Sequence, residues 1–332
     1  MANTTGTFLR RSSALMVIAV TALAATGCGA DSSAPAASAG SGEPQTIRIA
    51  VQAIADFAPI WLGVEQGYFE EQGIDVEIVE GGASSAAQVP LLLSGAADIA
   101  ATTAGAALQA SAQKLDVSII AGLTTFATED DLDQSGLVVA AGSEITDYAG
   151  LEGKTVAISG LKSITEAVVS AAVEEQGGDA SAVSFIQAPM PTLGDMVSTG
   201  GADAAFLIDP FLSLAVSSGL EVLGHPFPLV APGVPGTSLV STSAYAKANP
   251  ELIEKFRVAL EKAAAYATDN PEAVTKTLST EAKVPMEMLT GSKNPTFNSV
   301  VDAEQLKVES DLLERFGALD GTVDTTALVL AN

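Results

Sequence analysis

The sequence predicts an α/β fold of two similar α/β lobes with mainly parallel sheets, joined by a two-crossing hinge. The first reason is that residues 46–104 alternate between strand-like and helix-like segments, and right-handed crossovers between such segments build parallel sheets. The second reason is that this unit occurs again farther along the chain. Two copies of one α/β unit favour two lobes with a cleft between them.

Turn and cap residues place the helices of the first unit. Pro59 begins a short apolar segment and Gly67 follows it, which is the usual order of proline and glycine around a helix. Ser85 and Gln88 have the spacing of a capping box, so a second helix is expected to begin near Ser85. Strands are expected at residues 46–51, 75–79 and 98–101.

The second copy reproduces the first in order. TVAIS (155–159) corresponds to the first strand, and EEQGGDASAVSFI (174–186) matches EEQGIDVEIV (70–79). Asp203 corresponds to Asp98, because TGGADAAFLIDP (199–210) matches SGAADIAATTA (94–104). Two long copies are too few for a solenoid, so two lobes are the better interpretation.

Four motifs carry a resemblance to a known family: GYFEEQGIDVEIV, LLLSGAADIA, LEGKTVAISG and GGADAAFLIDP. With them the chain resembles the solute-binding proteins of ABC importers in the sulfonate, nitrate, taurine and pyrimidine-precursor group, which have the periplasmic binding protein type II fold. The resemblance covers about residues 46–320. It implies a small-molecule solute, an ABC permease and its ATPase as partners, a monomer, no cofactor and closure about a hinge.

The charge of the chain excludes some classes of partner. The formal net charge is −25, and such an acidic surface repels nucleic acid, whose binding depends on Lys and Arg contacts to phosphate. The same charge disfavours direct adsorption to an anionic membrane.

The N-terminus has the parts of a secretory leader, with basic Arg10 and Arg11 followed by an apolar run at residues 14–25. That run is too short for a permanent membrane span. Ala-Thr-Gly-Cys28 resembles the lipobox of bacterial lipoproteins, so we expect a signal peptide at residues 1–27, lipidation of Cys28 and a flexible tether at 28–45. A twin-arginine signal and an ordinary leader with a stray Cys are the alternatives.

The lobes are expected at residues 46–140, 141–235 and 236–332, with the first and third ranges forming lobe one. The apolar run at 136–142 lies where the chain of the resembled family first crosses between lobes. The Pro-rich segment at 225–236 is the expected return connection, followed by a strand at 237–243. Residues from Asn249 onward carry apolar side chains at helical spacing.

Catalytic and metal motifs are not found in the sequence. Cys28 is the only Cys and is expected to be lipidated, and His225 is the only His, with no partner apparent from sequence. No metal-ligand cluster, nucleophile elbow or P-loop occurs. The sequence therefore predicts a protein that is not an enzyme, without a cofactor or metal.

One acidic segment resembles the start of a calcium loop. Asp131, Asp133, Ser135 and Gly136 match the pattern, but Gly142 stands at the twelfth position, where a calcium loop needs a bidentate Glu. A solvated acidic loop is the better interpretation.

Candidate ligand-binding residues follow the carboxyl ends of strands, where ligands of open α/β sheets bind. Phe57 is expected either to stack on a planar solute or to pack under its loop, and Trp61 is expected in the core. Ser84 and Ser85 are at least as often plain helix caps as ligand contacts. The first-lobe candidates are Gln52, Asp56, Phe57, Ser84, Ser85, Thr102 and Thr103.

The second-lobe candidates are Lys162, Ser163, Met190 and Asp209. Ser163 begins a second capping box, and a helix start with a nearby Lys suits a carboxylate or sulfonate. Asp209 matches the family's acidic residue before Pro, and a structural cap is its alternative role. Lys162 alone among the cations between the tether and Gly236 follows the end of a predicted strand, although a solvent-facing loop Lys is its alternative.

These expectations describe an exported lipoprotein, anchored to the outer face of the cell membrane only through its lipid. It would capture a small organic solute, mono-anionic or neutral, such as a sulfonate, an aromatic carboxylate or a pyrimidine-like molecule, and deliver it to the permease. A ligand-presenting sensor subunit for a membrane receptor is the alternative. An enzyme on the same fold is a third.

Overall fold

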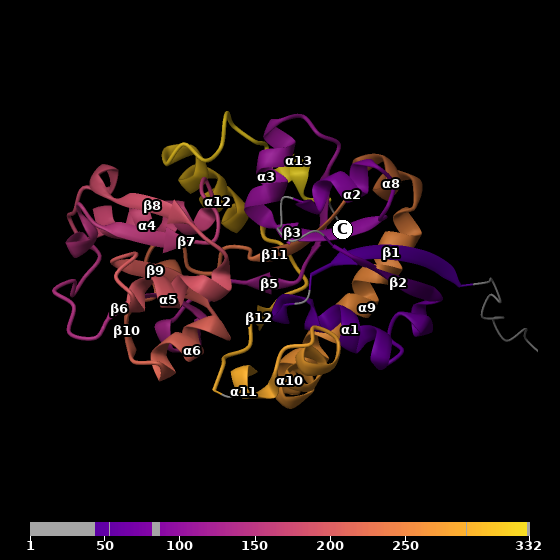
Figure 1. Ribbon diagram of the computed structural model, residues 1–332. Coiled ribbons are helices and arrows are strands. Elements are labelled where there is room, and N and C mark those ends of the chain that lie inside the picture. Colours follow the sequence, from indigo (N-terminus) through magenta and orange to yellow (C-terminus); the bar gives the residue numbers. More distant parts are fainter. Residues whose placement is uncertain (1–43, 53, 82–86, 290, 331–332) are drawn as a thin grey trace, which may run out of the picture. The chain divides into compact units, whose positions relative to one another are not determined.

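The first sheet contains five strands in the order β2-β1-β3-β11-β4, of which Figure 1 labels β1, β2, β3 and β11. Strand β11 is antiparallel to both neighbours, whereas β1, β2 and β3 run parallel. The computed structural model describes residues 44–52, 54–81, 87–289 and 291–330 of the chain. The strands are β1 (Gln45–Val51), β2 (Ile74–Glu80), β3 (Ile99–Thr103), β4 (Ser118–Gly122) and β11 (Thr237–Ser241). Strands were expected near β1, β2, β3 and β11.

The second sheet has the order β10-β6-β9-β7-β8. Strands β7, β8 and β9 are parallel, and β6 is antiparallel to β9 and to β10. The strands are β6 (Ser135–Ala140), β7 (Thr155–Ile158), β8 (Ser184–Gln187), β9 (Ala204–Ile208) and β10 (Leu220–Gly224). Two sheets of mostly parallel strands confirm the predicted fold class.

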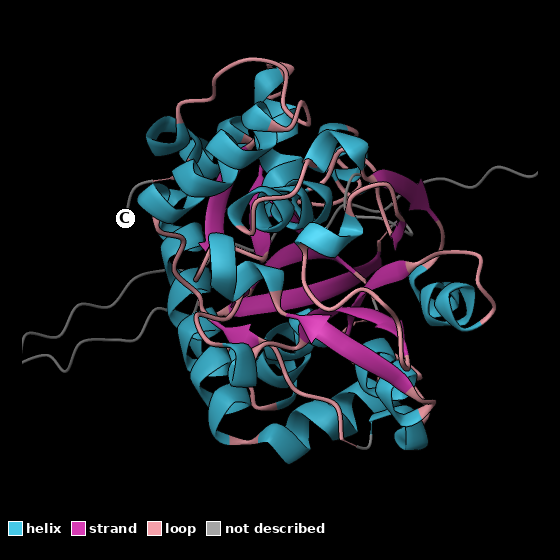
Figure 2. Ribbon diagram, turned by 90° about the vertical axis from the view of Figure 1, so that its left-hand side faces the viewer, coloured by secondary structure: helices cyan, strands magenta, loops and turns pink. Residues whose placement is uncertain are grey.

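Helices cover the sheets, and Figure 2 shows the strands in the interior with the helices outside them. The first five along the chain are α1 (Ala58–Glu65), α2 (Val89–Leu93), α3 (Ala104–Ala112), α4 (Ile164–Glu175) and α5 (Leu193–Ser198). They are followed by α6 (Phe211–Ser217), α7 (Pro226–Val230), α8 (Ser243–Ala248), α9 (Pro250–Asp269) and α10 (Pro271–Thr280). The last are α11 (Met286–Leu289), α12 (Ala303–Arg315) and α13 (Thr325–Leu328). Among the described residues no helix has the length and apolarity to cross a membrane.

The repeated unit has the same hydrogen bonds in both copies. The Asp98 carboxylate accepts a bond from the Arg48 amide at 2.9 Å, and the Asp98 amide donates to the Arg48 carbonyl at 2.9 Å. Asp203 makes the same pair of bonds with Thr155, at 2.8 and 2.9 Å. Each Asp thereby fixes the start of one strand against the start of its parallel neighbour.

Each of these aspartates is preceded, three residues earlier, by a glycine with a positive φ, which is 72° at Gly95 and 75° at Gly200. That conformation ends the preceding helix, and a side chain would strain it. The similarity that the sequence shows at this motif therefore reflects a turn with one required backbone geometry.

The chain passes from the first sheet to the second earlier than predicted. The run at 136–142 was expected as the crossing, and lobe one was expected to extend to residue 140. Instead Ser135–Ala140 forms β6, a strand inside the second sheet, so the crossing precedes Ser135. The run is apolar because β6 lies between β10 and β9 and is buried along most of its length.

Two connecting segments join the sheets and lie side by side. We call residues 123–134 the first connection and residues 225–236 the second connection. The Phe126 amide donates to the Val234 carbonyl and the Gly236 amide to the Thr124 carbonyl, both at 2.9 Å. The rings of Phe126 and Phe227 stack with centroids 3.4 Å apart, and Phe227 is fully buried. The two crossings therefore form one cross-linked hinge.

A third segment of the chain, residues 294–297, lies against the hinge. Strand β12 (Thr296–Phe297) pairs with β5 (Thr124–Thr125) of the first connection. We call the part of the molecule built on the first sheet the first half and the part built on the second sheet the second half. Helix α12 packs on α3 of the first half and on α4 of the second half (Figure 1). Arg315 at its end pairs with Glu174 of α4. The C-terminal part of the chain, expected within lobe one, therefore contacts both halves.

Helix α12 buries one carboxyl group. Glu309 is fully buried, and among the described residues no hydrogen-bond partner of normal geometry reaches either of its carboxyl oxygens. Gly105 of α3 makes room for it, since a Cβ there would lie 2.9 Å from Oε1. Burial raises the pKa of Glu309 to about 8, and the Gly105 amide opposes this only in part. Glu309 is thus protonated in the folded protein at neutral pH.

We predict that Glu309→Gln stabilises the protein more as the pH rises. Because the pKa of Glu309 is about 8 when folded and about 4.5 when unfolded, the folded state holds one extra proton between these values. Wild-type stability therefore falls as pH rises through this window, and Gln removes that loss. The expected gain in unfolding free energy is on the order of 1–3 kcal/mol at pH 7 and near zero at pH 4.

Urea unfolding at several pH values between 4 and 8 measures this difference. The control is Glu314→Gln, which alters an exposed Glu of the same helix. A gain that is independent of pH, or equal in the control, contradicts the buried-acid interpretation.

Candidate functional site

Both connections run between the edges of the two sheets at which the parallel strands have their carboxyl ends. Thr237 at the start of β11 pairs with Thr103 at the carboxyl end of β3. Ser135 at the start of β6 pairs with Ile208 at the carboxyl end of β9. Because β11 and β6 are the antiparallel strands, each connection runs from the carboxyl edge of one sheet to the carboxyl edge of the other. The candidate residues that the structure describes follow strand ends at these same edges.

In the first half, the loop after β1 contacts the hinge. Gln52 directly follows β1 and is partly exposed, and Asp56 lies in a short 3-10 helix before α1. The Asp56 carboxylate accepts hydrogen bonds from the hydroxyls of Thr237 at 2.5 Å and Thr124 at 3.2 Å. Burial raises the pKa of Asp56, and these two hydroxyls oppose the rise because they favour the ionised form.

Phe57 lies in the core. Its side chain is 1% exposed, and its ring centroid is 6.3 Å from that of Trp61. Of the two roles expected for Phe57, the structure shows packing under the loop, and in this conformation the ring has no face open to a solute. Trp61 is partly exposed and packs against the core cluster that contains Phe57.

The candidate hydroxyls of the first half are at the end of β3. Thr102 is 1% exposed. Thr103 caps α3, since its Oγ1 accepts the Ala106 amide at 3.2 Å. Ser84 and Ser85 lie outside the described residues, and the described part of the second helix begins at Val89.

In the second half, Ser163 caps α4 as predicted, but Glu166 bonds to the amide of Lys162 rather than to that of Ser163, as a capping box would require. The Ser163 Oγ accepts the Glu166 amide at 3.4 Å and donates to the Gly160 carbonyl at 2.7 Å. The Glu166 carboxylate accepts the amide of Lys162 at 2.6 Å. Lys162 has φ of 52° and an exposed side chain, and its carbonyl accepts a bond from Gln109 of α3 at 2.8 Å. The loop before α4 thus contacts the first half directly.

Met190 and Asp209 follow the ends of β8 and β9. Met190 is partly exposed and packs against the core of the second sheet. The Asp209 carboxylate accepts the Ser213 amide at 2.9 Å and the Lys293 amide at 2.6 Å. Asp209 therefore caps α6, its alternative role, and also holds the segment that follows α11.

Several hinge residues were missed by the sequence reasoning. The Lys293 ammonium donates to the Asp133 carbonyl at 3.0 Å, and His225 donates to the Ser135 carbonyl at 2.6 Å through Nδ1. Burial raises the pKa of Asp133, against the opposing effect of the Ser135 amide and hydroxyl. Thr124 and Thr237 were missed as well. Their one signal in the sequence was their position, because Thr124 follows β4 closely and Thr237 begins β11.

Asp133, His225 and Ser135 do not form a nucleophile arrangement. The Ser135 hydroxyl is fully buried and donates to Asp133 Oδ1 at 2.9 Å. His225 Nδ1 bonds to the Ser135 backbone rather than to its hydroxyl. Within the described ranges, no group of three or more His, Cys, Asp or Glu residues is placed to hold a metal ion.

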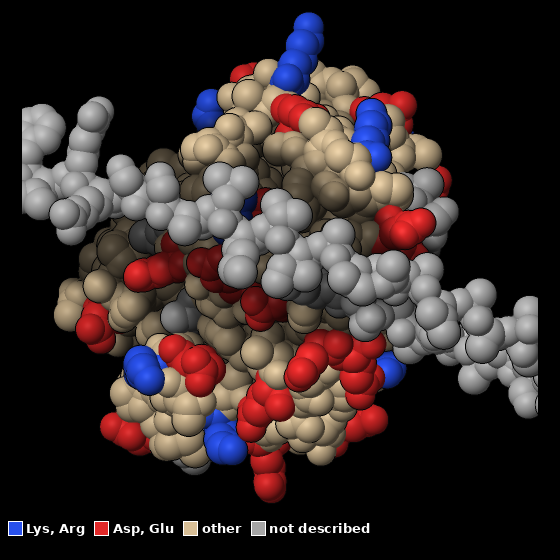
Figure 3. All heavy atoms as spheres, turned by 90° about the vertical axis from the view of Figure 1, so that its right-hand side faces the viewer, with Lys and Arg blue, Asp and Glu red and all other residues tan. Residues whose placement is uncertain are grey.

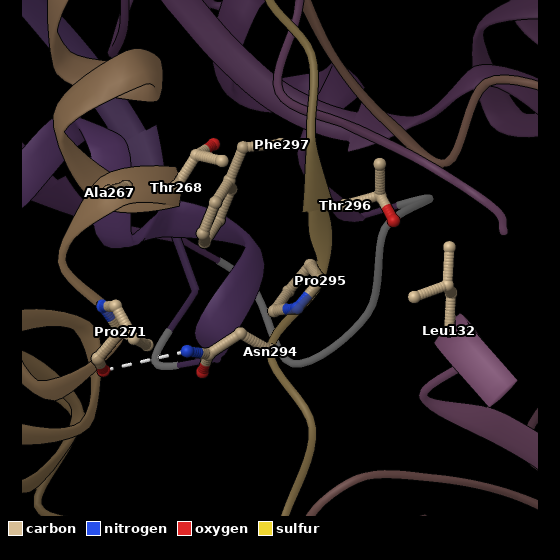
Figure 4. A pocket seen from close by; sticks show the side chains of 8 residues that line it. All are labelled: Leu132, Ala267, Thr268, Pro271, Asn294, Pro295, Thr296 and Phe297. Carbon is tan, nitrogen blue, oxygen red and sulfur yellow. Dashed lines mark hydrogen bonds between the residues drawn. The ribbon is translucent and has the colours of Figure 1, made fainter.

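A cavity of about 260 Å³ lies where the first connection meets the third segment. Figure 4 shows its side chains, with a bond of 3.5 Å from the Asn294 amide to the Pro271 carbonyl. Its lining contains no charged side chain and consists of Leu132, Ala267, Thr268, Pro271, Asn294, Pro295, Thr296 and Phe297. Figure 3 shows a contrasting outer surface, on which acidic side chains predominate over basic ones.

Solved structures share this fold. The alkanesulfonate-binding protein SsuA of Xanthomonas axonopodis pv. citri, bound to MOPS, matches with a TM-score of 0.70 and 19% identity over 87% of this chain and 99% of its own. The aliphatic sulphonate-binding SsuA of Escherichia coli matches with a TM-score of 0.73 and 19% identity over 86% and 97%. The nitrate-binding NrtA of Synechocystis PCC 6803 matches with a TM-score of 0.68 and 17% identity over 86% and 85%.

At these identities the likeness shows the fold. No curated protein sequence matches the chain. A family model described as NMT1/THI5 like matches residues 54–274, which include both connections between the sheets. The chain therefore belongs to the NMT1/THI5-like family.

Proposed function

We propose that this chain is the extracytoplasmic solute-binding protein of an ABC importer. It captures a small organic solute between its two halves and delivers the solute to the permease. The observation that carries the proposal is that both connections join the carboxyl edges of the two sheets, which are the edges where α/β proteins bind ligands. Three of the structures that share the fold are named for binding sulfonates or nitrate, which supports the same class of function.

The proposed solute site uses exposed and partly exposed groups at these edges. Gln52 and Thr103 contribute from the first half, and Lys162, Ser163 and Met190 from the second. Thr103 and Ser163 cap helices of nine and twelve residues, so a solute near them meets the positive ends of two helix dipoles. Of the remaining candidates, we assign Asp56, Phe57, Thr102 and Asp209 to shaping the site, while Ser84 and Ser85 lie outside the described residues.

The solute that fits these groups is mono-anionic or neutral. Lys162 supplies one cation, whereas the acidic field of the chain opposes a multiply charged anion. The Arg48 guanidinium is already paired with Asp98 at the opposite edge of the first sheet. A sulfonate, an aromatic carboxylate or a pyrimidine-like molecule has this character.

The hydrogen bonds of Ser135 and His225 at the hinge favour a binding role over catalysis. The buried Ser135 hydroxyl and the backbone bond of His225 leave neither group in position to attack a substrate. We further propose export and a lipid anchor, based on the leader pattern and Cys28, which lie outside the described residues.

The lipid anchor is tested by Cys28→Ser. Loss of the acylated thiol should move the protein from the membrane fraction to the medium or periplasm, because anchoring depends on buried acyl chains. Cell fractionation with an immunoblot measures this. A wild-type protein that is already soluble after export contradicts the proposal.

Solute binding should be one to one and should close the two halves about the hinge. The radius of gyration from solution X-ray scattering should therefore fall when the bound solute is added. Mass spectrometry of small molecules that co-purify with the protein identifies the solute to use. A saturating solute that leaves the scattering curve unchanged contradicts a two-lobe clamp.

The role of Lys162 is tested with an anionic solute. Because a charge-assisted bond to an exposed ammonium is partly screened, Lys162→Ala should weaken binding roughly tenfold. Isothermal titration calorimetry measures the affinity. The matched control is Lys154→Ala, which removes the same charge just before β7, at the end of that strand away from Lys162. Equal affinities for both variants and wild type remove Lys162 from the site.

A further inference from the structure

Asp56 forms a closed set of hydrogen bonds with both connections. Its Oδ2 accepts from the hydroxyl of Thr237, which begins β11 at the end of the second connection, at 2.5 Å. The same oxygen accepts from the hydroxyl of Thr124, in β5 of the first connection, at 3.2 Å. The Thr124 Oγ1 in turn accepts the Thr237 amide at 2.9 Å. One carboxylate thereby ties the loop after β1 to both crossings at once.

The two threonines are committed to this arrangement. Thr124 is 3% exposed and Thr237 is 6% exposed, so their hydroxyls have little access to water. A buried hydroxyl that loses its acceptor leaves an unsatisfied donor, which is costly. The Asp56 carboxylate is the group that satisfies both hydroxyls.

The set of bonds continues toward the second sheet. The Gln134 side chain lies near Asp56 and favours the ionised form of its carboxyl group. The Gln134 carbonyl accepts the Asp209 amide at 2.8 Å, directly beyond β9. Asp56 is thus linked through one residue to the carboxyl edge of the opposite half.

We propose that Asp56 is a positioning residue, which couples the first-half loop carrying Gln52 to closure of the two halves. This inference rests on the proposed function. The carboxylate does not hold the solute itself, because its bonds are given to the hinge. A solute that moves the loop after β1 shifts Asp56, and the threonines transmit that shift to both connections.

The test measures the distance between the halves in the full chain with Cys28→Ser. Spin labels are attached at Ser94→Cys and Ser198→Cys, which are exposed and lie directly after α2 and at the last residue of α5. Double electron–electron resonance gives the distance distribution without any ligand. Asp56→Asn replaces an acceptor oxygen by a donor, and Thr237→Val removes one of the hydroxyls with little change of shape.

The matched control is Asp98→Asn. Asp98 is also a carboxylate that holds two segments of the first sheet, but it bonds to Arg48 at the opposite edge, away from the connections. A merely structural role for Asp56 would therefore affect both variants alike. We expect Asp56→Asn and Thr237→Val to broaden or shift the distance distribution, while Asp98→Asn retains the wild-type distribution even if its thermal stability falls. A wild-type distribution in Asp56→Asn overturns the inference.

A second arm uses ethanesulfonate, benzoate and cytosine as probes. With any probe that shortens the wild-type distance, Asp56→Asn should show at most half of that shortening at saturation. Full closure of the variant overturns the inference. If none of the probes shortens the wild-type distance, that result counts against the proposed solute class, whereas the ligand-free comparison still decides the role of Asp56.

Discussion

The constraint on which the rest of the structure depends is the direction of two strands. Strand β11 runs antiparallel to β3, and β6 runs antiparallel to β9, whereas β3 and β9 belong to the parallel strands of their sheets. Both connections therefore start and end at carboxyl edges. The connections are then cross-linked by backbone bonds such as Phe126 to Val234, and by the stacked rings of Phe126 and Phe227. With the strands reversed, the ends that carry the candidate residues would lie away from the hinge, and closure would not enclose them.

Features that depend on local geometry leave a pattern in the sequence, from which the repeat around Asp98 and Asp203 and the Ser163 cap were predicted, although the bonds and backbone angles of these turns were seen only in the structure. The bonds of Asp98 and Asp203, the positive φ of the glycines before them and the Ser163 cap each need particular residues at fixed spacing. Such requirements persist in both copies and are visible as repeated letters. The strands and the fold class followed from them, because alternation of strands and helices constrains the sheet topology.

Features that depend on distant contacts could not be predicted. An apolar run does not reveal whether it crosses between lobes or lies within a sheet, and the burial of β6 settled this for residues 135–140. Asp209 is followed by Pro in sequence, yet its partner Lys293 lies far along the chain. Phe57 was open to two roles because only the packing of α1 against its neighbours decides whether the ring is covered. Glu309 reads as a polar face residue until α3 covers it.

The carboxylates around the hinge also limit what a solute can gain there. Asp56, Asp133 and Asp209 accept bonds from hydroxyls and amides of the protein, so each negative charge is already stabilised by fixed donors. A cationic solute therefore has to displace internal bonds before it can pair with them, and leaves buried donors unsatisfied. At the site we propose, near the caps of α3 and α4, a neutral solute or a single anion would require no such exchange. The internal hydrogen bonding of the acidic residues thus favours solutes that the net charge alone would not select.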